Sequence, residues 1–487
     1  MVRTGVEVTT ALSAGRRNTG VASARYHVAG ITERGPVGVA YRISSPAEYE
    51  AVFGGRTAKA EDLHNDARLF FAERGAEMYV TRVVGAGATR GFITLDDASG
   101  IPTIRIELNE PGAYSAKTSV KIEEAPNNTF NLSVYQEGLL VLRLAGLESP
   151  QDLLTRTLRH PLITVNNLAS TSAAPGNNPA PTPEPVPMSP GTDDFTSITA
   201  EDYITALNET GEATRGGAVA VPGLAADIIG PGLITHGAAY QKVVILCGDV
   251  ETTEEEIKEM AGDLTNPEDA SHAGVFWPFV ILPDDTNTGS RYVAPCGYVA
   301  AVRARAHTTV GYWQIPAGDR STAVAITGLA SPVDTRRNNS LAEAYVSGII
   351  SDGGSIKLYN WWSLSPDRQN FQYLSVRDEL NNIAMDVAAE LRPFIFSTWD
   401  SRGKLLNQIF SAVKGVLATL AERDAVSARI NPSDGSVLDP GYKIAVDAPS
   451  GAFIEDNTII VRIEVRTPQT AQLIKSEIVR VPLDAAL

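Results

Sequence analysis

The sequence predicts a multidomain protein of mixed α+β and α/β class, and three observations lead to that prediction. Its 487 residues exceed what one hydrophobic core holds. Residues 195–330 alternate helix-like and strand-like segments, which is typical of a parallel α/β sheet. Residues 91–168 instead alternate Thr, Ile and Val between turn residues. We therefore expect an α/β core of mixed sheets with amphipathic helices, an inserted β-rich outer domain and extended terminal arms.

The composition is that of a soluble globular protein, with 43% hydrophobic and 20% charged residues. No stretch approaches the roughly 18 apolar residues of a membrane span, and the first residues lack the apolar centre of a signal peptide. We therefore expect no direct membrane insertion and assembly in a cytoplasm. The formal charge of −16 argues against nucleic acid as a partner, because phosphate binding requires clustered Lys and Arg.

The first ninety residues divide into an arm and the start of the core. In the predicted N-terminal arm, residues 1–20, Val6 and Val8 alternate with polar neighbours. In residues 21–90, a strand is expected to end at Gly35-Pro36, since Pro cannot donate to a ladder. Ser45 and Glu48 then predict a capping box for a short helix that stops after Phe53 at Gly54.

Two further helix and strand signals complete this part of the core. Leu63, Ala67, Phe70 and Phe71 mark the apolar face of a helix that Gly75 is expected to end. The segment MYVTRVVG, residues 78–85, then predicts a buried strand.

The middle of the chain changes character twice. Within 91–168, the segments GFITL, TIRIEL, TSVKIEE, TFNLSVY and GLLVLRL each predict a strand of the inserted β-rich domain. Residues 169–194 are rich in Pro, Ser and Asn and predict a surface linker or long loop. Thr199 with Asp202 then starts a helix of the α/β domain, and FWPFVIL, residues 276–282, predicts one of its strands.

The last third is expected to form a C-terminal α+β core domain over 331–470, followed by an arm strand over 471–487. Residues 377–394 and 404–425 have the period of amphipathic helices. Lys404 and Lys414 fall on the polar side of the second helix. A strand with period 2 follows, whose apolar face comprises Ile459, Val461, Ile463 and Val465.

Signals for chemistry are weak throughout. The glycine-rich segment 85–91 is not a Gly-x-Gly-x-x-Gly motif and leads into a strand. The six histidines are scattered, and neither Cys247 nor Cys296 has a metal-binding spacing, so both cysteines are expected to be small core residues. We therefore expect no enzyme activity, no catalytic or metal-binding residues and no cofactor.

Three blocks of sequence resemble the contractile tail sheath proteins. The first block includes Arg34, Gly35 and Pro36 and continues through Phe53 and Gly54 to the strand at 79–83. The second includes Pro295 and Gly297 and ends near Pro316, and the third runs from 341 through Trp361-Trp362 to the two helices and the strand near 460. Together they cover most of the chain outside 91–194.

The resemblance implies a structural subunit of a phage tail sheath. Such a subunit forms stacked rings in a helical homo-oligomer around an inner tail tube protein, between baseplate and tail terminator proteins. Contraction drives the tube through the host envelope with energy stored at assembly. The location implied is the virion tail, assembled in the host bacterial cytoplasm. The motif residues of the first two blocks are then structural, and the turn at 34–36 redirects the chain between strands.

Two hypotheses concern contacts within such an assembly. Val6 and Val8 of one arm, and Ile478, Val479, Arg480 and Val481 of the other, would add strands to a neighbour's sheet that contains Ile459 to Val465. The alternative is that both termini pair within their own subunit. Lys404 and Lys414 would face the tube, although ordinary solvated lysines explain them equally well.

Three other functions stay open at this point. A headless contractile injection system or bacteriocin would use the same fold and mechanism. An α/β enzyme with a β-rich appendage would bind its ligand at the carboxyl ends of the strands. A host-binding or capsid protein is disfavoured, because the resemblance reaches both halves of the chain.

Overall fold

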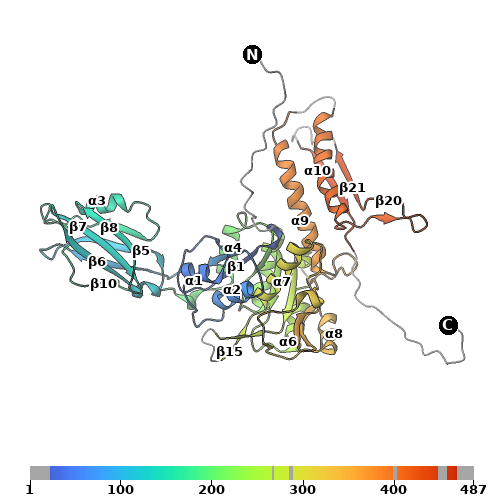
Figure 1. Ribbon diagram of the computed structural model, residues 1–487, viewed down its shortest axis with the longest axis horizontal. Helices are drawn as coiled ribbons and strands as arrows, with labels where there is room; N and C mark the ends of the chain where they lie inside the picture. The colour runs from blue at the N-terminus through green and yellow to red at the C-terminus, as the bar shows by residue number, and fades with distance from the viewer. Residues whose placement is uncertain (1–21, 266–267, 285–288, 399–402, 448–457, 469–487) are drawn as a thin grey trace, which may run out of the picture. The chain divides into compact units, whose positions relative to one another are not determined.

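The computed structural model describes residues 22–265, 268–284, 289–398, 403–447 and 458–468 of the chain. These residues fall into two compact units. Figure 1 shows their helices and strands, coloured along the chain. The first unit extends to residue 308 and also includes 316–374, and the second combines 309–315 with the chain from residue 375 onward. The predicted arm residues Val6, Val8 and Ile478 to Val481 lie outside the described residues.

The first unit contains an eight-stranded sheet of order β18-β17-β13-β12-β11-β1-β3-β2. The strands are β1 (Tyr26–Gly30), β2 (Tyr41–Ile43), β3 (Met78–Arg82), β11 (Ala218–Ala220), β12 (Val243–Cys247), β13 (Ala273–Trp277), β17 (Val346–Asp352) and β18 (Ser355–Leu358). Six central strands are parallel, and β2 and β18 are antiparallel edge strands. Along the chain, strands are first added on one side of β1, as far as β3. Later strands are added on its other side, from β11 to β17. The direction of winding therefore reverses between β1 and β11, as in doubly wound α/β folds.

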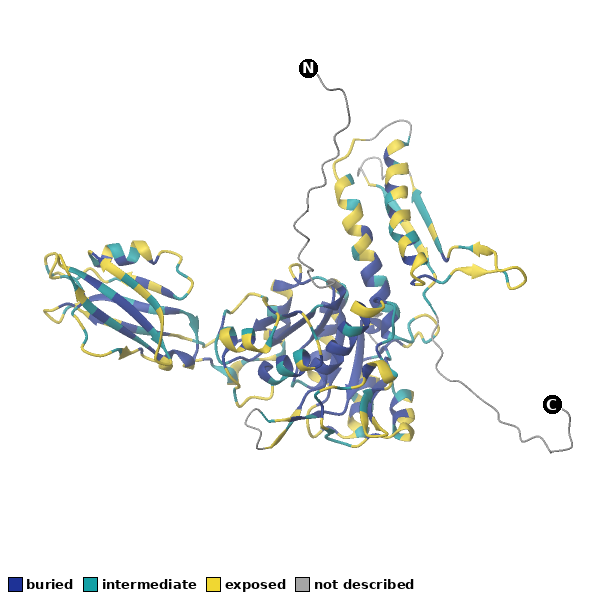
Figure 2. Cartoon of the chain, viewed as in Figure 1, coloured by how far each residue is buried: buried dark blue, intermediate teal, exposed yellow. Residues whose placement is uncertain are grey.

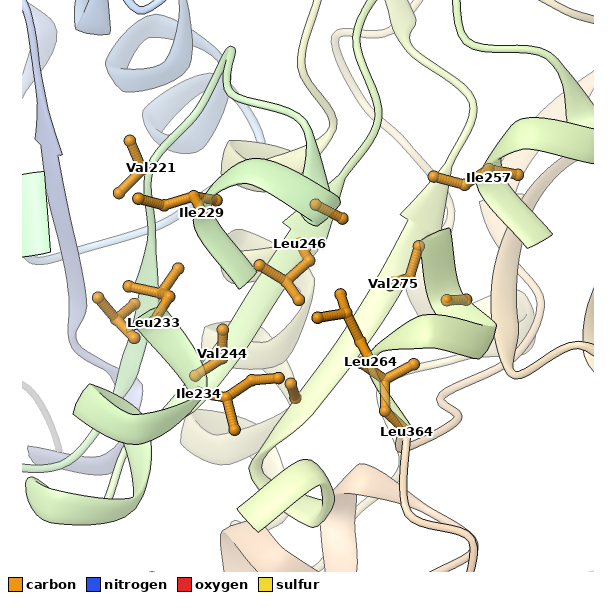
Figure 3. Close-up of a cluster of buried hydrophobic side chains, with 14 of the residues drawn as sticks. Val221, Ile229, Leu233, Ile234, Val244, Leu246, Ile257, Leu264, Val275 and Leu364 are labelled. Carbon is orange, nitrogen blue, oxygen red and sulfur yellow. The ribbon is translucent and has the colours of Figure 1, made fainter. Parts of the chain in front are cut away.

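Helices cover both faces of this sheet. They are α1 (Pro46–Phe53), α2 (Leu63–Ala72), α4 (Ala200–Thr210), α5 (Ala226–Ala239), α6 (Glu254–Asp263), α7 (Cys296–Thr309) and α8 (Thr335–Glu343). Leu207, Leu233 and Ile257, from α4, α5 and α6, share one buried cluster with sheet residues such as Val244 and Val275. Figure 3 shows Leu233 and Ile257 of this cluster beside Val244 and Val275. On β1, Tyr26 and Ala29 point to opposite faces, so Tyr26 packs instead against Phe70 of α2.

Shorter elements complete the first unit outside its β-rich part. A three-stranded antiparallel sheet comprises β15 (Ser290–Val293), β14 (Val280–Pro283) and β16 (Gly328–Leu329). The 3-10 helices are η1 (Ala22–Ala24), η3 (Phe195–Ser197), η4 (Glu268–His272) and η5 (Gly318–Ser321). The segment predicted as one strand over 276–282 is divided between β13 and β14, because Pro278 has no N–H to continue the ladder.

The predicted helix ends are partly correct. The capping box of Thr199 and Asp202 forms at α4. Ser45 accepts from the Glu48 N–H at 3.2 Å, but the Glu48 carboxylate accepts from the N–H and hydroxyl of Ser44 instead of completing a box. The left-handed residue after α2 is Arg74, with φ of 69°, and not Gly75. Gly75 is required for space, since a Cβ there would lie 2.4 Å from the Phe70 ring.

Residues 90–187 form a β-sandwich within the first unit. One sheet has the order β4 (Arg90–Asp96), β5 (Pro102–Pro111), β9 (Ile163–Asn167), and the other β10 (Val186–Pro187), β6 (Thr118–Ala125), β7 (Thr129–Gln136), β8 (Leu139–Leu147). η2 (Ala113–Lys117) and α3 (Pro150–Arg156) connect strands. Each of the five strand-like segments forms a strand, and inward residues such as Ile106, Ile122 and Leu132 are fully buried.

Residues 169–194, predicted as a surface linker or long loop, form a long segment with little regular structure that packs along the sandwich. Its Val186 and Pro187 pair with β6, and Met188 is buried in the sandwich core. The N–H of Ala180 donates to the Asp96 carbonyl at 2.9 Å, and that of Thr182 donates to the Ile122 carbonyl at 2.9 Å. Pro residues are tolerated because the segment runs along sheet edges, where the non-Pro N–H groups find partners.

The second unit is built from two long helices and two β-ribbons. Its elements are α9 (Leu374–Leu391), η6 (Arg392–Phe394), α10 (Lys404–Glu422), β19 (Arg429–Ile430), β20 (Val437–Asp439), β21 (Tyr442–Asp447) and β22 (Ile460–Val465). The boundary differs from the predicted residue 331, because the apolar strand β17 pairs with β13 in the first unit's sheet. Among the described residues, no helix is long and apolar enough to span a membrane.

Candidate assembly site

The β21–β22 ribbon has one packed face and one solvent face. Val461, Ile463 and Val465 of β22 pack against a core that includes Val413 and Leu417 of α10. Arg462, Glu464 and Arg466 alternate with them and are exposed. Ile459, predicted as the first residue of this strand, directly precedes β22 and is half-buried. The period-2 pattern of the sequence therefore sets which side of the strand faces the core.

The register of the ribbon determines which backbone groups point outward. The strands pair antiparallel with Tyr442 opposite Val465 and Ile444 opposite Ile463. The Arg466 N–H donates to the Gly441 carbonyl at 2.8 Å, so this pair bonds across the ribbon. In an antiparallel ladder, bonded and non-bonded pairs alternate. The N–H and C=O groups of Val461, Ile463 and Val465 therefore point to the outer edge of β22.

In the described part of the chain, no strand pairs with either outer edge of this ribbon. β21 offers the same outward groups at Tyr442, Ile444 and Val446. A two-stranded ribbon is marginally stable alone, and its unpaired edges are templates for added strands. The arrangement can accept one extended segment on each side while the packed face stays on the helices.

The long helix α10 presents the polar face that the sequence predicts. Leu405, Ile409 and Val413 are buried, whereas Lys404 and Lys414 are exposed. Figure 2 shows the exposed stripe along this helix. A shallow hollow of about 530 Å³ near the start of α10 is lined by Phe394, Lys404, Asn407, Gln408 and Ser411. The structure thus places both lysines at exposed positions of α10.

The turn at 34–36 joins the core to the β-sandwich. The Arg34 guanidinium donates to the Tyr114 hydroxyl at 2.7 Å and to the carbonyls of Glu50 and Ala51 near the end of α1. Gly35 has φ of 109°, and a Cβ there would lie 2.6 Å from the Phe53 ring. The turn therefore requires Gly for its backbone and holds helix α1 against the sandwich.

Gly54 and Pro36, which lie close to this turn, also have structural roles. Gly54 ends α1 with φ of 80°, and its N–H donates to the Glu50 carbonyl. Pro36 directly follows Gly35 and lines a hollow of about 420 Å³ together with Arg34 and Tyr114.

A buried ion pair that the sequence reasoning missed lies beside this turn. Arg82, fully buried at the end of β3, donates to the Asp193 carboxylate at 2.7 Å. It also donates to the carbonyls of Gly35 and Pro111 at 2.7 and 3.0 Å. The pair therefore ties together the turn, the core strand and both connections to the sandwich. An Arg at the end of an apolar strand is the signal that could have indicated a buried pair.

The residues of the second motif block have packing roles. Pro295 precedes α7, and its carbonyl accepts the Val299 N–H at 3.0 Å. A Cβ at Gly297 would lie 2.6 Å from the Asp66 carbonyl oxygen, so α7 approaches α2 closely only with Gly there. Pro316 is buried where the chain re-enters the first unit.

A cavity of about 550 Å³ lies at the carboxyl edge of the parallel sheet. Among the described residues that line it are Pro222 after β11, Asp249 after β12, and Asp62 and Asp66. Among the described residues of its lining there is no His, Cys or Ser. Two of its carboxylates make hydrogen bonds within the fold. Asp62 accepts from the backbone N–H groups of Thr57 and His64, and Asp66 accepts from the Tyr26 hydroxyl. Burial raises the pKa of Asp66 to about 7.

Known structures match this chain over nearly its whole length. A tail sheath protein of Listeria innocua has a TM-score of 0.64 at 12% identity, and the match covers 91% of each chain. A sheath tail protein of Desulfitobacterium hafniense has a TM-score of 0.57 at 12% identity, covering 95% of this chain and 100% of that one. The helical sheath of the anti-feeding prophage in its contracted state has a TM-score of 0.55 at 14% identity, covering 98% and 99%.

No protein-family model matches the chain, and no curated protein matches it in sequence. The similarity is therefore carried by the order and packing of the elements and not by residue identity. These matches extend through the α/β sheet, the inserted sandwich and the C-terminal unit. The chain has the fold of contractile tail sheath proteins.

Proposed function

We propose that this chain is the structural subunit of a contractile tail sheath. Copies would form stacked rings in a helical sheath around an inner tube protein, bounded by baseplate and tail terminator proteins. Contraction would drive the tube through a cell envelope, without a cofactor and without enzyme activity. The observation that carries the proposal is the β21–β22 ribbon, whose two outer edges are unpaired within the described residues of a chain with a sheath fold.

Strand addition explains how such subunits could hold together and still move. An arm containing Val6 and Val8, and another containing Ile478 to Val481, would each pair with the ribbon of a neighbouring copy. Main-chain hydrogen bonds to the outward groups of Ile463 and its alternate neighbours would fix the register. Head-to-tail contacts whose rotation does not close build an open helical array. Such strand exchange would let whole subunits rotate during contraction while the paired strands stay together.

The α10 face supports a second contact, toward the tube. Lys404 and Lys414 are exposed on the same helix whose opposite side packs on the ribbon. An acidic tube surface would complement them. This arrangement would put the strand-exchange ribbon and the tube contact on one small unit, so assembly on the tube and ring-to-ring linkage would be coupled.

Electron microscopy of the concentrated, purified chain tests the proposal. We expect hollow, striated tubes wider than a tail tube, either alone or after mixing with the tube protein encoded beside the gene. A chain that stays monomeric under both conditions contradicts the sheath function. Genome neighbours then separate a phage from a headless injection system, because a phage also encodes capsid and terminase proteins.

Arm variants test the mechanism separately. Deletion of residues 1–18 should leave folded monomers and abolish ordered tubes, and so should Val6→Asp with Val8→Asp. Glu7→Lys with Thr9→Lys is the matched control, since these side chains alternate with the valines. Ordered sheaths formed by the deleted chain would exclude the arm while leaving the sheath function intact, and would favour termini that pair within their own subunit.

A further inference from the structure

The two cysteines of this chain lie in direct contact inside the first unit. Cys247, the last residue of β12, and Cys296, the first residue of α7, have their sulfurs 3.6 Å apart. They are separated by 49 positions and are the only cysteines in 487 residues. Both are buried, with 2% and 1% exposure. Two thiols in contact can react with each other once one of them is oxidised.

We propose that Cys247 and Cys296 form an oxidisable dithiol site, whose co-reactant is a hydroperoxide and whose product is an intramolecular disulfide. One thiolate attacks the O–O bond of hydrogen peroxide, which gives a sulfenic acid and releases water after protonation. The second thiol then attacks the sulfenic sulfur, the S–S bond forms and a second water leaves. Two thiols and one peroxide thus give one disulfide and two waters. This inference is independent of the proposed function.

Geometry favours the second step. A disulfide requires sulfurs about 2.05 Å apart, so the two atoms must approach by roughly 1.5 Å. Both residues lie at element ends, where a side chain can rotate without moving the middle of a strand or helix. Cys247 is held by its pairing with Phe276 of β13, and Cys296 starts α7 directly after Pro295. The product would tie the carboxyl end of a central strand to the amino end of a helix.

The surroundings of the two thiols make their oxidation slow and favour a small oxidant. Contact with Cys247 and burial raise the pKa of the Cys296 thiol, with Asp66 acting in the same direction. Tyr26 donates to Asp66 at 2.9 Å, and both groups interact electrostatically with the Cys296 thiol. Thiolate is the reactive form, so oxidation is faster at alkaline pH. A small peroxide suits this buried pair better than a bulky disulfide reagent. In a reducing cytoplasm the thiols persist, and outside it the bond can form.

The test uses the full chain, with and without hydrogen peroxide, followed by catalase and alkylation in denaturant. We expect the treated protein to lose two hydrogen masses, to take up no iodoacetamide and to run as a monomer on a non-reducing gel. Trypsin separates the cysteines into peptides 243–258 and 292–303, which should be recovered crosslinked. The melting midpoint of the first unit should rise by roughly 5 °C and return with dithiothreitol.

Single variants trap the intermediate. In Cys247→Ser the sulfenic acid of Cys296 has no partner, so dimedone should label it, and Cys296→Ser should give the reciprocal result. Wild-type protein should show little dimedone label under the same conditions. Full alkylation after peroxide, oxidation to sulfinic acid without a crosslinked peptide, or a crosslink between chains would each overturn the proposal. The wild-type measurement decides even where a serine variant does not fold.

Discussion

The Arg82 guanidinium and the Asp193 carboxylate meet at 2.7 Å across 111 positions of the chain. Arg82 is fully buried and Asp193 nearly so, and a second Asp193 oxygen accepts the Ala113 N–H at 2.9 Å. The same arginine binds the carbonyl of Gly35. The pair therefore links the two chain segments that connect the inserted sandwich to the core, and it holds both beside the turn at 34–36.

Removing one partner of this pair should destabilise the first unit. Arg82→Met leaves the Asp193 charge buried without its counter-ion, and we expect the free energy of unfolding to fall by about 3 kcal/mol. Urea unfolding measures the loss. Arg90→Met, at an exposed arginine eight positions away, should change it by less than about 0.5 kcal/mol. Equal effects from the two variants would mean that the ion pair has no special role.

Lys242 should make the free energy of unfolding of the first unit depend on pH in the alkaline range. Its Nζ lies 2.8 Å from His27 Nδ1, 2.8 Å from Thr214 Oγ1 and 3.3 Å from His236 Nε2. Burial, with a smaller contribution from Arg215, lowers the pKa of Lys242 from 10.5 to about 7. Between these values the unfolded chain binds a proton that the folded chain does not. The free energy of unfolding should therefore rise as the pH increases from about 7 to 10.

Urea unfolding at several pH values checks this expectation. Lys242→Met removes the titrating group, so the rise in stability over that pH window should disappear. Lys59→Met, at an exposed lysine, should retain it. An unchanged slope in the Lys242→Met protein would show that another group titrates there.

Charge reversal on α10 should affect assembly on the tube and not folding. Lys404→Glu with Lys414→Glu changes two exposed side chains, so the circular dichroism spectrum and melting midpoint should be unchanged. Tube-templated sheaths, counted by electron microscopy, should be lost. Arg56→Glu with Lys59→Glu is the matched control, because it changes the net charge equally at exposed positions of the first unit. Normal assembly of the Lys404/Lys414 variant would exclude a tube contact at these lysines.

The two units should respond separately to core substitutions. Leu417 is fully buried in the core of α9, α10 and the ribbon, and Leu233 is fully buried under the parallel sheet. Each Leu→Ala change leaves a cavity that costs about 2–5 kcal/mol. Leu417→Ala should lower only the melting transition of the second unit, and Leu233→Ala only that of the first. Scanning calorimetry resolves the two transitions, and a single transition shifted by both variants would contradict independent units.

Local sequence signals predicted many elements correctly. The five strands of the sandwich, the Thr199 capping box and the polar face of α10 follow from residue periodicity and cap chemistry. These signals depend on neighbours within a few positions, and the same neighbours exist in the folded chain. Strand β22 was likewise indicated by the alternation from Val461 to Val465. Its partner β21 and the unpaired outer edges of the ribbon were not, because strand pairing is a property of the whole chain.

The sequence by itself determined where most helices and strands lie, which side of each is apolar, and that both cysteines are core residues. Only the tertiary structure decided that β17 joins the first unit's sheet, that 169–194 packs along the sandwich, and that Arg82 meets Asp193. It also decided that the two thiols touch. The physical reason is range: periodicity and capping act over one or two turns, whereas these contacts join residues that only the folded path of the chain brings together.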